Sequence, residues 1–235
     1  MSSTRVLLAV VSGLMFLAGC NSTFLGGGKN ESDQLVEDVE VTVNEQKRAE
    51  LLKKIDRDFE NPDAHYELGQ LYQSEGMWFQ AEREYSIALG FDPVHREAQG
   101  ARVKVLVEGG DQGQADLSAD FYINQVSQLA AGSLRLAMAF QNNQLDELAL
   151  RCYHQALRLA PNSAKINRQI GFYHLSKDDK QQAGDYLTRS FQLDPHQPGV
   201  AFALGKLGVA VQVPRKTEKN TKKLDKIIES GRRTE

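Results

Sequence analysis

An alanine recurs every 34 residues along the middle of this 235-residue chain, at Ala81, Ala115, Ala149 and Ala183. A fixed period of this length indicates a repeat architecture, in which each unit packs mainly against its neighbours. In three of the four units the alanine has matching companions at the same spacings. These companions are Leu68-Gly69, Tyr72, Tyr85, Ala88 and Pro93; Leu136-Ala137, Phe140, Tyr153, Ala156 and Pro161; and Ile170-Gly171, His174, Leu187, Ser190 and Pro195.

The spacings predict a pair of helices in each unit. The Leu-Gly pair and the following aromatic share one face of a first helix, and the two small residues with the aromatic between them share one face of a second. Small residues let the two helices approach closely, and the proline ends the second helix because it cannot continue one. The turn between the helices falls at Gly76, Gly110, Gln144 and Asp178, and three of these four residues suit a turn.

This pattern resembles the tetratricopeptide repeat (TPR), whose 34-residue unit has a Leu-Gly pair, an aromatic, an alanine, an aromatic and a closing proline. The resemblance covers residues 62–197 and implies an all-α, right-handed TPR solenoid of antiparallel helix pairs. Its four units are 62–95, 96–129, 130–163 and 164–197. None has the family's Trp at its fourth position, which holds His65, Gln99, Ser133 and Asn167.

The second unit departs most from the repeat pattern. The departures are Arg102 in place of Leu, Val103 in place of Gly, Ala119 in place of the aromatic and Ser127 in place of the proline, while Leu106, Gly110, Ala115 and Tyr122 keep the register. We therefore expect a helix pair here too, with either altered packing or an opened groove.

Both ends of a repeat array need helices that cover its apolar faces. Residues 46–61 form a plausible N-terminal capping helix, with Leu51, Leu52, Ile55 and Phe59 on one face. Residues 198–213 are expected to form the C-terminal capping helix, since Leu204-Gly205 repeats the phase once more.

The N-terminus has the pattern of a lipoprotein signal peptide over residues 1–19. Its apolar stretch from Val6 to Leu17 is too short to span a bilayer as a helix. The following Leu17-Ala18-Gly19-Cys20 resembles the lipobox of bacterial lipoproteins, which implies lipidation at Cys20 and a membrane anchor. Asn21, in place of the Asp that retains such proteins in the inner membrane, favours the periplasmic face of the outer membrane in a Gram-negative bacterium. The alternative is an ordinary secretory signal.

Residues 20–45 are expected to be a flexible tether. Its first part is Gly-rich, and residues 31–45 contain six acidic residues and no basic one. Cys152 is the only other cysteine, which leaves no intramolecular disulfide after Cys20 is lipidated, and we expect a buried, inert thiol.

The tail, residues 214–235, carries eight basic against four acidic residues. It is either a solvated, fraying helix or a basic contact for an acidic partner, peptidoglycan or lipid phosphate.

Patterns of catalytic or metal chemistry are missing from the sequence. The five histidines form no HExxH pair, and no serine lies in a G-x-S-x-G pattern. The formal net charge of −3 gives no reason to expect nucleic-acid binding. We expect no enzyme activity, no cofactor and no metal site.

In the TPR family, the second, fifth, ninth and twelfth residues of each unit face a concave groove that binds peptides. Carried over to this sequence, they are Asp63, Tyr66, Gln70 and Gln73 in the first unit, Leu134, Met138 and Gln141 in the third, and Lys165, Arg168, Phe172 and Leu175 in the fourth. Tyr66 and Gln70 stand where the chaperone-binding members carry Lys and Asn, so their carboxylate clamp is not expected. For each residue the alternative is a solvated helix face without a ligand.

The organisation of the sequence, with lipobox, tether and repeats, is similar to that of pilus-assembly lipoproteins, the type IV pilotins and the tight-adherence pilus lipoproteins. It implies a membrane-anchored adaptor that binds envelope proteins in the assembly of a pilus or secretion apparatus. The alternative is an adaptor for peptidoglycan-remodelling enzymes, suggested by the periplasmic placement and the basic tail.

Overall fold

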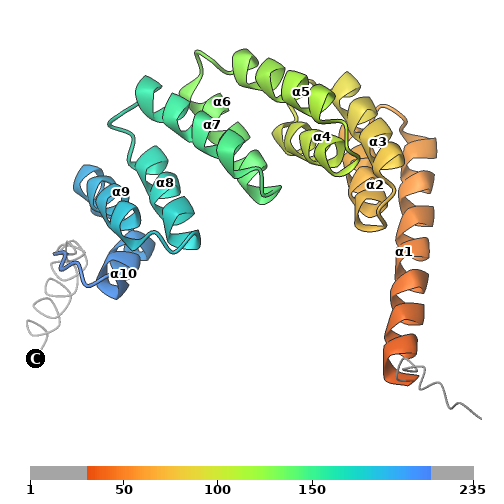
Figure 1. Cartoon of the computed structure of the whole chain (residues 1–235), viewed down its shortest axis with the longest axis horizontal. Helices are drawn as coiled ribbons and strands as arrows, with labels where there is room; N and C mark the ends of the chain where they lie inside the picture. Colours follow the sequence, from red (N-terminus) through yellow and green to blue (C-terminus); the bar gives the residue numbers. More distant parts are fainter. Residues whose placement is uncertain (1–30, 213–235) are drawn as a thin grey trace, which may run out of the picture. The chain divides into compact units, whose positions relative to one another are not determined.

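The structure is a computed structural model that describes the backbone of residues 31–212 and the side chains of residues 43–212. The expected signal peptide, Cys20 with the start of the tether, and the basic tail lie outside the described residues. Residues 31–212 contain ten helices and no strand (Figure 1). They are α1 (Glu31–Arg57), α2 (Pro62–Ser74), α3 (Trp78–Phe91), α4 (Arg96–Glu108), α5 (Gln112–Gln125), α6 (Ala130–Asn142), α7 (Asp146–Leu159), α8 (Ala164–Ser176), α9 (Lys180–Leu193) and α10 (Pro198–Lys206).

The helices follow the predicted repeat. Each unit forms one antiparallel pair, in the order α2 with α3, α4 with α5, α6 with α7 and α8 with α9 (Figure 1). The expected all-α fold of TPR type is confirmed. The chain divides after Val43 into two compact units, and all packing described below lies within the second. Within residues 31–212, every helix falls short of the length or the apolar character that a membrane-spanning helix requires.

The same turn ends the first helix of every unit. Gly76, Gly110, Gln144 and Asp178 have φ of +73°, +84°, +59° and +57°. In each turn the next residue donates its backbone N–H to a carbonyl in the last turn of the helix, as Met77 does to Tyr72 and Leu145 to Phe140, both at 2.9 Å. This is the Schellman motif, in which a left-handed residue satisfies the last carbonyl groups. All four residues therefore act as helix stops, including Gln144.

Close contact inside each pair depends on the small residues of the pattern. Ala81, Ala149 and Ala183 are fully buried. A Cβ atom on Gly69 would lie 2.6 Å from Cε1 of Tyr85, and one on Gly171 would lie 2.7 Å from Cγ of Leu187. The glycine of the first helix thus leaves the space that the large residue of the second helix fills.

The fourth position of each unit holds a buried polar residue that is hydrogen-bonded to the connection before it. His65, Gln99, Ser133 and Asn167 are at most 2% exposed. The backbone carbonyls that accept their hydrogen bonds are Phe59 O at 3.0 Å, Pro93 O at 2.7 Å, Val126 O at 3.0 Å and Pro161 O at 3.2 Å. These bonds give each buried polar side chain a partner, and they link each unit to the connection that precedes it.

The altered packing expected of the second unit is observed. Arg102 lies between α3 and α5, where its guanidinium donates to Glu82 Oε1 at 2.9 Å and Ser86 Oγ at 2.9 Å. It also donates to Ser118 Oγ at 3.2 Å and Tyr122 Oη at 3.1 Å. On another side of α4, a Cβ on Gly100 would lie 2.9 Å from the carbonyl oxygen of Ala139, so α4 packs very closely against α6.

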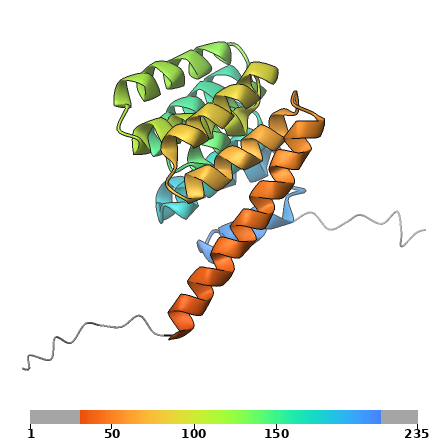
Figure 2. The same ribbon diagram turned by 90° about the vertical axis from the view of Figure 1, so that its right-hand side faces the viewer.

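The two capping helices differ from their expected bounds. α1 begins at Glu31, inside the segment expected to be a flexible tether, and Figure 2 shows it as one uninterrupted helix. No Gly or Pro interrupts residues 31–57, and acidic residues near a helix N-terminus are favourable. α10 ends at Lys206, short of the expected residue 213, because Gly208 has φ +78° and stops the helix with another Schellman turn.

Both capping helices cover apolar faces of the array. Leu51 and Ile55 of α1 pack with Leu68 of α2, and Val200 and Leu204 of α10 pack with residues of α9. This is the role that the sequence predicts for them, although Leu52 and Phe59, expected on the same face as Leu51 and Ile55, are exposed.

Candidate peptide-binding groove

Four of the predicted groove residues meet in one pocket. Leu134 and Met138 come from α6, and Lys165 and Arg168 come from α8. The cavity has a volume of about 590 Å³, within the range of pockets that enclose several ligand side chains. We call it the α6–α8 pocket. Its other lining residues are Ala130, Ala131, Arg135, Ala160, Ser163, Ile166 and Gln169.

The repeat pattern explains how the α6–α8 pocket forms. Lining residues of α6 recur at spacings of three and four, so they share one face of that helix, and the same holds for α8. Alanines at 130, 131 and 160 leave space where longer side chains would fill the pocket. Leu134 and Ile166 are almost completely buried and provide an apolar floor. Gln169 Nε2 lies 3.3 Å from the sulfur of Met138 and thereby joins the two helices.

The charge of the α6–α8 pocket has one sign. α6 and α8 carry Arg135, Lys165 and Arg168 but no Asp or Glu. Among residues 43–212 no carboxylate forms an ion pair with any of the three, and Arg168 donates instead to Gln197 Oε1 at 3.2 Å. Burial and, to a lesser extent, the nearby Arg135 lower the pKa of Arg96, while Asp92 and Glu97 act in the opposite direction.

The groove continues towards α10. A second cavity of about 470 Å³ shares Arg168 and Gln169 with the first and is also lined by Phe172. The remaining lining residues are Asp194, His196, Gln197, Pro198, Gly199 and Val200. Leu175, also predicted for the groove, packs instead with the apolar cluster of α9 and α10.

The predicted groove residues of the first unit do not join this pocket. Gln70 donates to the hydroxyl of Tyr66 at 2.9 Å, and the Tyr66 ring lies 4.8 Å from that of His95. A carboxylate oxygen of Asp63 lies 3.3 Å from Nε2 of His95. The contacts of Tyr66 and Asp63 with His95 link α2 to the residue that caps α4.

The twelfth position has a structural role that the sequence analysis missed. Gln73 accepts a hydrogen bond from the hydroxyl of Tyr85 at 2.7 Å, and Gln141 accepts one from Tyr153. The signal was present in the sequence, because both pairs have the same spacing of twelve residues. In the fourth unit the corresponding residues, Leu175 and Leu187, are both apolar.

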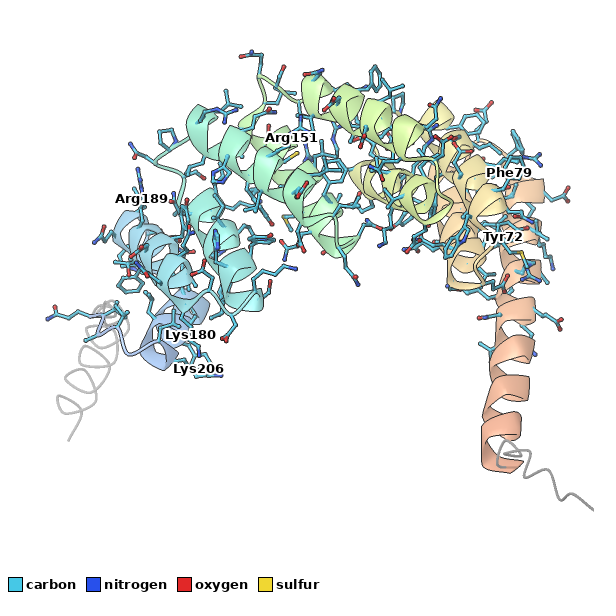
Figure 3. All side chains as sticks on the ribbon, in the orientation of Figure 1. Tyr72, Phe79, Arg151, Lys180, Arg189 and Lys206 are labelled. Carbon is cyan, nitrogen blue, oxygen red and sulfur yellow. The ribbon has the colours of Figure 1, made fainter. Side chains whose placement is uncertain are left out.

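The sequence analysis also missed two cavities between α3 and α5, which both include Arg102. One, of about 610 Å³, is lined by Trp78 and Phe79, and the other, of about 320 Å³, is lined by Phe121. Phe79, labelled in Figure 3, is 78% exposed. The signal was the run of departures in the second unit, because Arg102, which lines both cavities, stands where the other units have an apolar residue.

The groups that line the α6–α8 pocket are suited to binding. They are apolar side chains, an amide and three cations, which can hold a ligand by contact, hydrogen bonding and charge. In the described part of the chain, no three metal-ligating side chains converge. Cys152 is fully buried, and burial raises the pKa of its thiol to about 12, which makes it a poor nucleophile at neutral pH.

No family model matches the sequence, and no curated protein matches it either. Among solved structures, PilF of Pseudomonas aeruginosa is 24% identical over 62% of this chain and 67% of its own, with a TM-score of 0.37. YrrB, described as a TPR protein with an unusual peptide-binding site, is 18% identical over 72% of this chain and 86% of its own, with a TM-score of 0.37. A TPR protein of Thermus thermophilus is 13% identical over 73% of this chain and 94% of its own, with a TM-score of 0.42.

Proposed function

We propose that this protein is a non-catalytic scaffold that binds a peptide segment of another protein in the α6–α8 pocket. The observation that carries the proposal is the convergence of Leu134, Met138, Lys165 and Arg168, from two different units, on one cavity. Its continuation towards α10 gives the groove the length that an extended or helical segment needs.

The proposal includes a membrane anchor at Cys20 and a place on the periplasmic face of the outer membrane. It is supported by the lipobox-like Leu17-Ala18-Gly19-Cys20 and by Asn21. In this setting the scaffold binds an envelope protein during assembly of a pilus or secretion apparatus. The support for that role is the organisation of the sequence.

The groove is tested by photo-cross-linking in intact cells of the source bacterium. A photoreactive residue replaces Met138 in one strain and Phe79 in another, so that each strain probes one surface. We expect a discrete cross-linked envelope protein from position 138, and loss of that product when Arg135 and Arg168 are both changed to Glu. A product from position 79 alone would overturn the groove assignment and direct attention to the cavities beside Arg102.

The anchor is tested separately with Cys20→Ser. We expect wild type to stay in the membrane fraction and to incorporate labelled fatty acid, and the variant to do neither. Retention in the membrane would contradict the proposed lipidation. Capture of peptidoglycan enzymes that is lost on deletion of residues 214–235 would favour the alternative adaptor role.

A further inference from the structure

The cations of the α6–α8 pocket gather without a carboxylate partner, whereas several cations elsewhere on the third and fourth units are paired. Arg151 of α7 pairs with Asp120 at 2.8 Å, Lys177 pairs with Asp146 at 2.7 Å, and Lys180 pairs with Asp178 at 3.3 Å. These carboxylates come from other elements or from the turn before the helix. Arg135, Lys165 and Arg168 have no such carboxylate within residues 43–212, and neither do Arg158 of α7 and Arg189 of α9. What sets the first three apart is that they line one pocket together.

The three cations surround an apolar floor. Arg135 and Lys165 are exposed at the rim, Arg168 is half-buried, and Leu134 and Ile166 below them are 4% and 3% exposed. A ligand that fills this pocket must present an apolar side chain to the floor and negative charge to the rim.

Resting on the proposed function, we propose that the segment bound in this groove is an acidic peptide with Asp or Glu on either side of an aliphatic side chain. The aliphatic side chain lies against Leu134, Met138 and Ile166. The flanking carboxylates accept hydrogen bonds from the guanidinium groups of Arg135 and Arg168 and from the ammonium group of Lys165.

The shape of the groove favours a peptide over a small anion. The α6–α8 pocket and the cavity beside α10 share Arg168 and Gln169, so one elongated ligand can occupy both. Its carboxylates belong at the α6–α8 pocket, because Asp194 lines the second cavity. An inorganic phosphate or a lipid headgroup would meet the cations but leave the apolar floor uncovered. The apolar floor and the cationic rim together therefore favour a peptide over a small anion.

The test measures binding of fluorescent dodecapeptides to the full-length protein in detergent. All peptides are acetylated and amidated, so neither end contributes a charge. The first has two Leu among Glu and Asp, the second has the same Leu among Gln and Asn, and the third has Ser in place of Leu among Glu and Asp. Binding is measured by fluorescence anisotropy at low and high salt.

We expect the acidic Leu peptide to bind at least about tenfold more tightly than either of the other two, and less tightly at high salt. Arg168→Glu and Lys165→Glu should each weaken it by about tenfold or more. The matched control is Arg189→Glu, the same charge change on the exposed side chain labelled on α9 in Figure 3, which should leave affinity unchanged.

Equal binding of the neutral Leu peptide, lost in Met138→Glu, would overturn the inference about charge while leaving the proposed scaffold role intact. Full displacement by inorganic phosphate, or equal binding of the Ser peptide, would identify a simple anion site and also overturn it. Absence of binding by all three peptides overturns it as well, and the cross-link at position 138 then decides the scaffold role independently.

Discussion

At the scale of single residues, the repeat works because small side chains stand where two helices meet. Gly69 and Gly171 occupy the same position in two units, and each faces a large, fully buried side chain of its partner helix. Some other glycines, such as Gly90, have open space instead, so the same substitution should have opposite effects at the two kinds of site.

Gly69→Ala should lower the free energy of unfolding by about 1–3 kcal/mol, because the new Cβ would lie 2.6 Å from the Tyr85 ring. Gly90→Ala, also in a helix but with nothing within 4 Å, should be neutral or stabilising. Chemical denaturation of both variants measures the difference. A Gly69→Ala protein as stable as wild type would show that the ring moves aside freely.

Gln144 adopts φ of +59° in a turn where two other units have glycine. Gln144→Gly should raise the free energy of unfolding by about 0.5–1 kcal/mol, because glycine adopts this conformation without a steric penalty. Gly110→Ala, at φ +84°, should lower stability. Thermal unfolding checks both changes. A less stable Gln144→Gly protein together with a more stable Gly110→Ala protein would exclude backbone strain as the cause.

Cys152 is neutral in the folded protein well beyond the pH at which an exposed thiol ionises. Burial raises its pKa from 9.0 to about 12, so the unfolded chain loses its proton first as pH rises. Stability from this group is fully present below pH 9 and falls above it, by at most about 1.4 kcal/mol per pH unit. Between pH 9 and 10, Cys152→Ser should lose less stability per pH unit than its Cys152 parent. Both proteins carry Cys20→Ser, and parallel profiles would contradict the prediction.

At the scale of elements, the second unit keeps its helix pair by a different kind of contact. Arg102 replaces an apolar core residue, and its guanidinium joins α3 to α5 through four hydrogen bonds. Burial opposes its charge, but the hydrogen bond with Tyr122 and the Glu82 carboxylate outweigh this effect and raise the pKa of Arg102.

Arg102→Met should lower the free energy of unfolding by about 1–3 kcal/mol, because Glu82, Ser118 and Tyr122 lose their shared donor. Arg189→Met, which changes an exposed side chain, should have an effect within about 0.5 kcal/mol. Urea denaturation provides both values. A stable Arg102→Met protein would show that an apolar side chain serves equally well at this position.

At the scale of the whole molecule, each helix pair of the array packs mainly against the helices beside it in the sequence. α10 protects the apolar face of the fourth unit, where Leu187 and Phe191 pack with Val200 and Leu204. Stability in such an array is close to a sum over units and their interfaces, so damage to one end should stay there.

Leu204→Ala should lower stability by about 2–4 kcal/mol because Leu204 is fully buried. Hydrogen exchange should accelerate in α8 and α9 and stay unchanged in α2 and α3. Phe202→Ala on the same helix is the control, since Phe202 is 66% exposed and should have little effect. Uniform acceleration along the chain would show that the array unfolds as one cooperative unit.

The sequence by itself determined the period, the helix pairs and the four turns. These features depend on spacings of a few residues, which can be read from one stretch of chain. It did not determine where the flanking helices start and stop, because α1 extends through Glu31 without a breaker and α10 stops at Gly208.

The tertiary structure alone decided which predicted groove residues line a common cavity. Leu134, Met138, Lys165 and Arg168 come together because α6 and α8 lie on either side of one cavity, whereas Tyr66 and Gln70 are engaged with each other and with α4. The tertiary structure also decided which cations form ion pairs with carboxylates of the protein itself. The physical reason is that a side chain's partners come from helices distant in sequence, and the repeat pattern specifies only its own face of each helix.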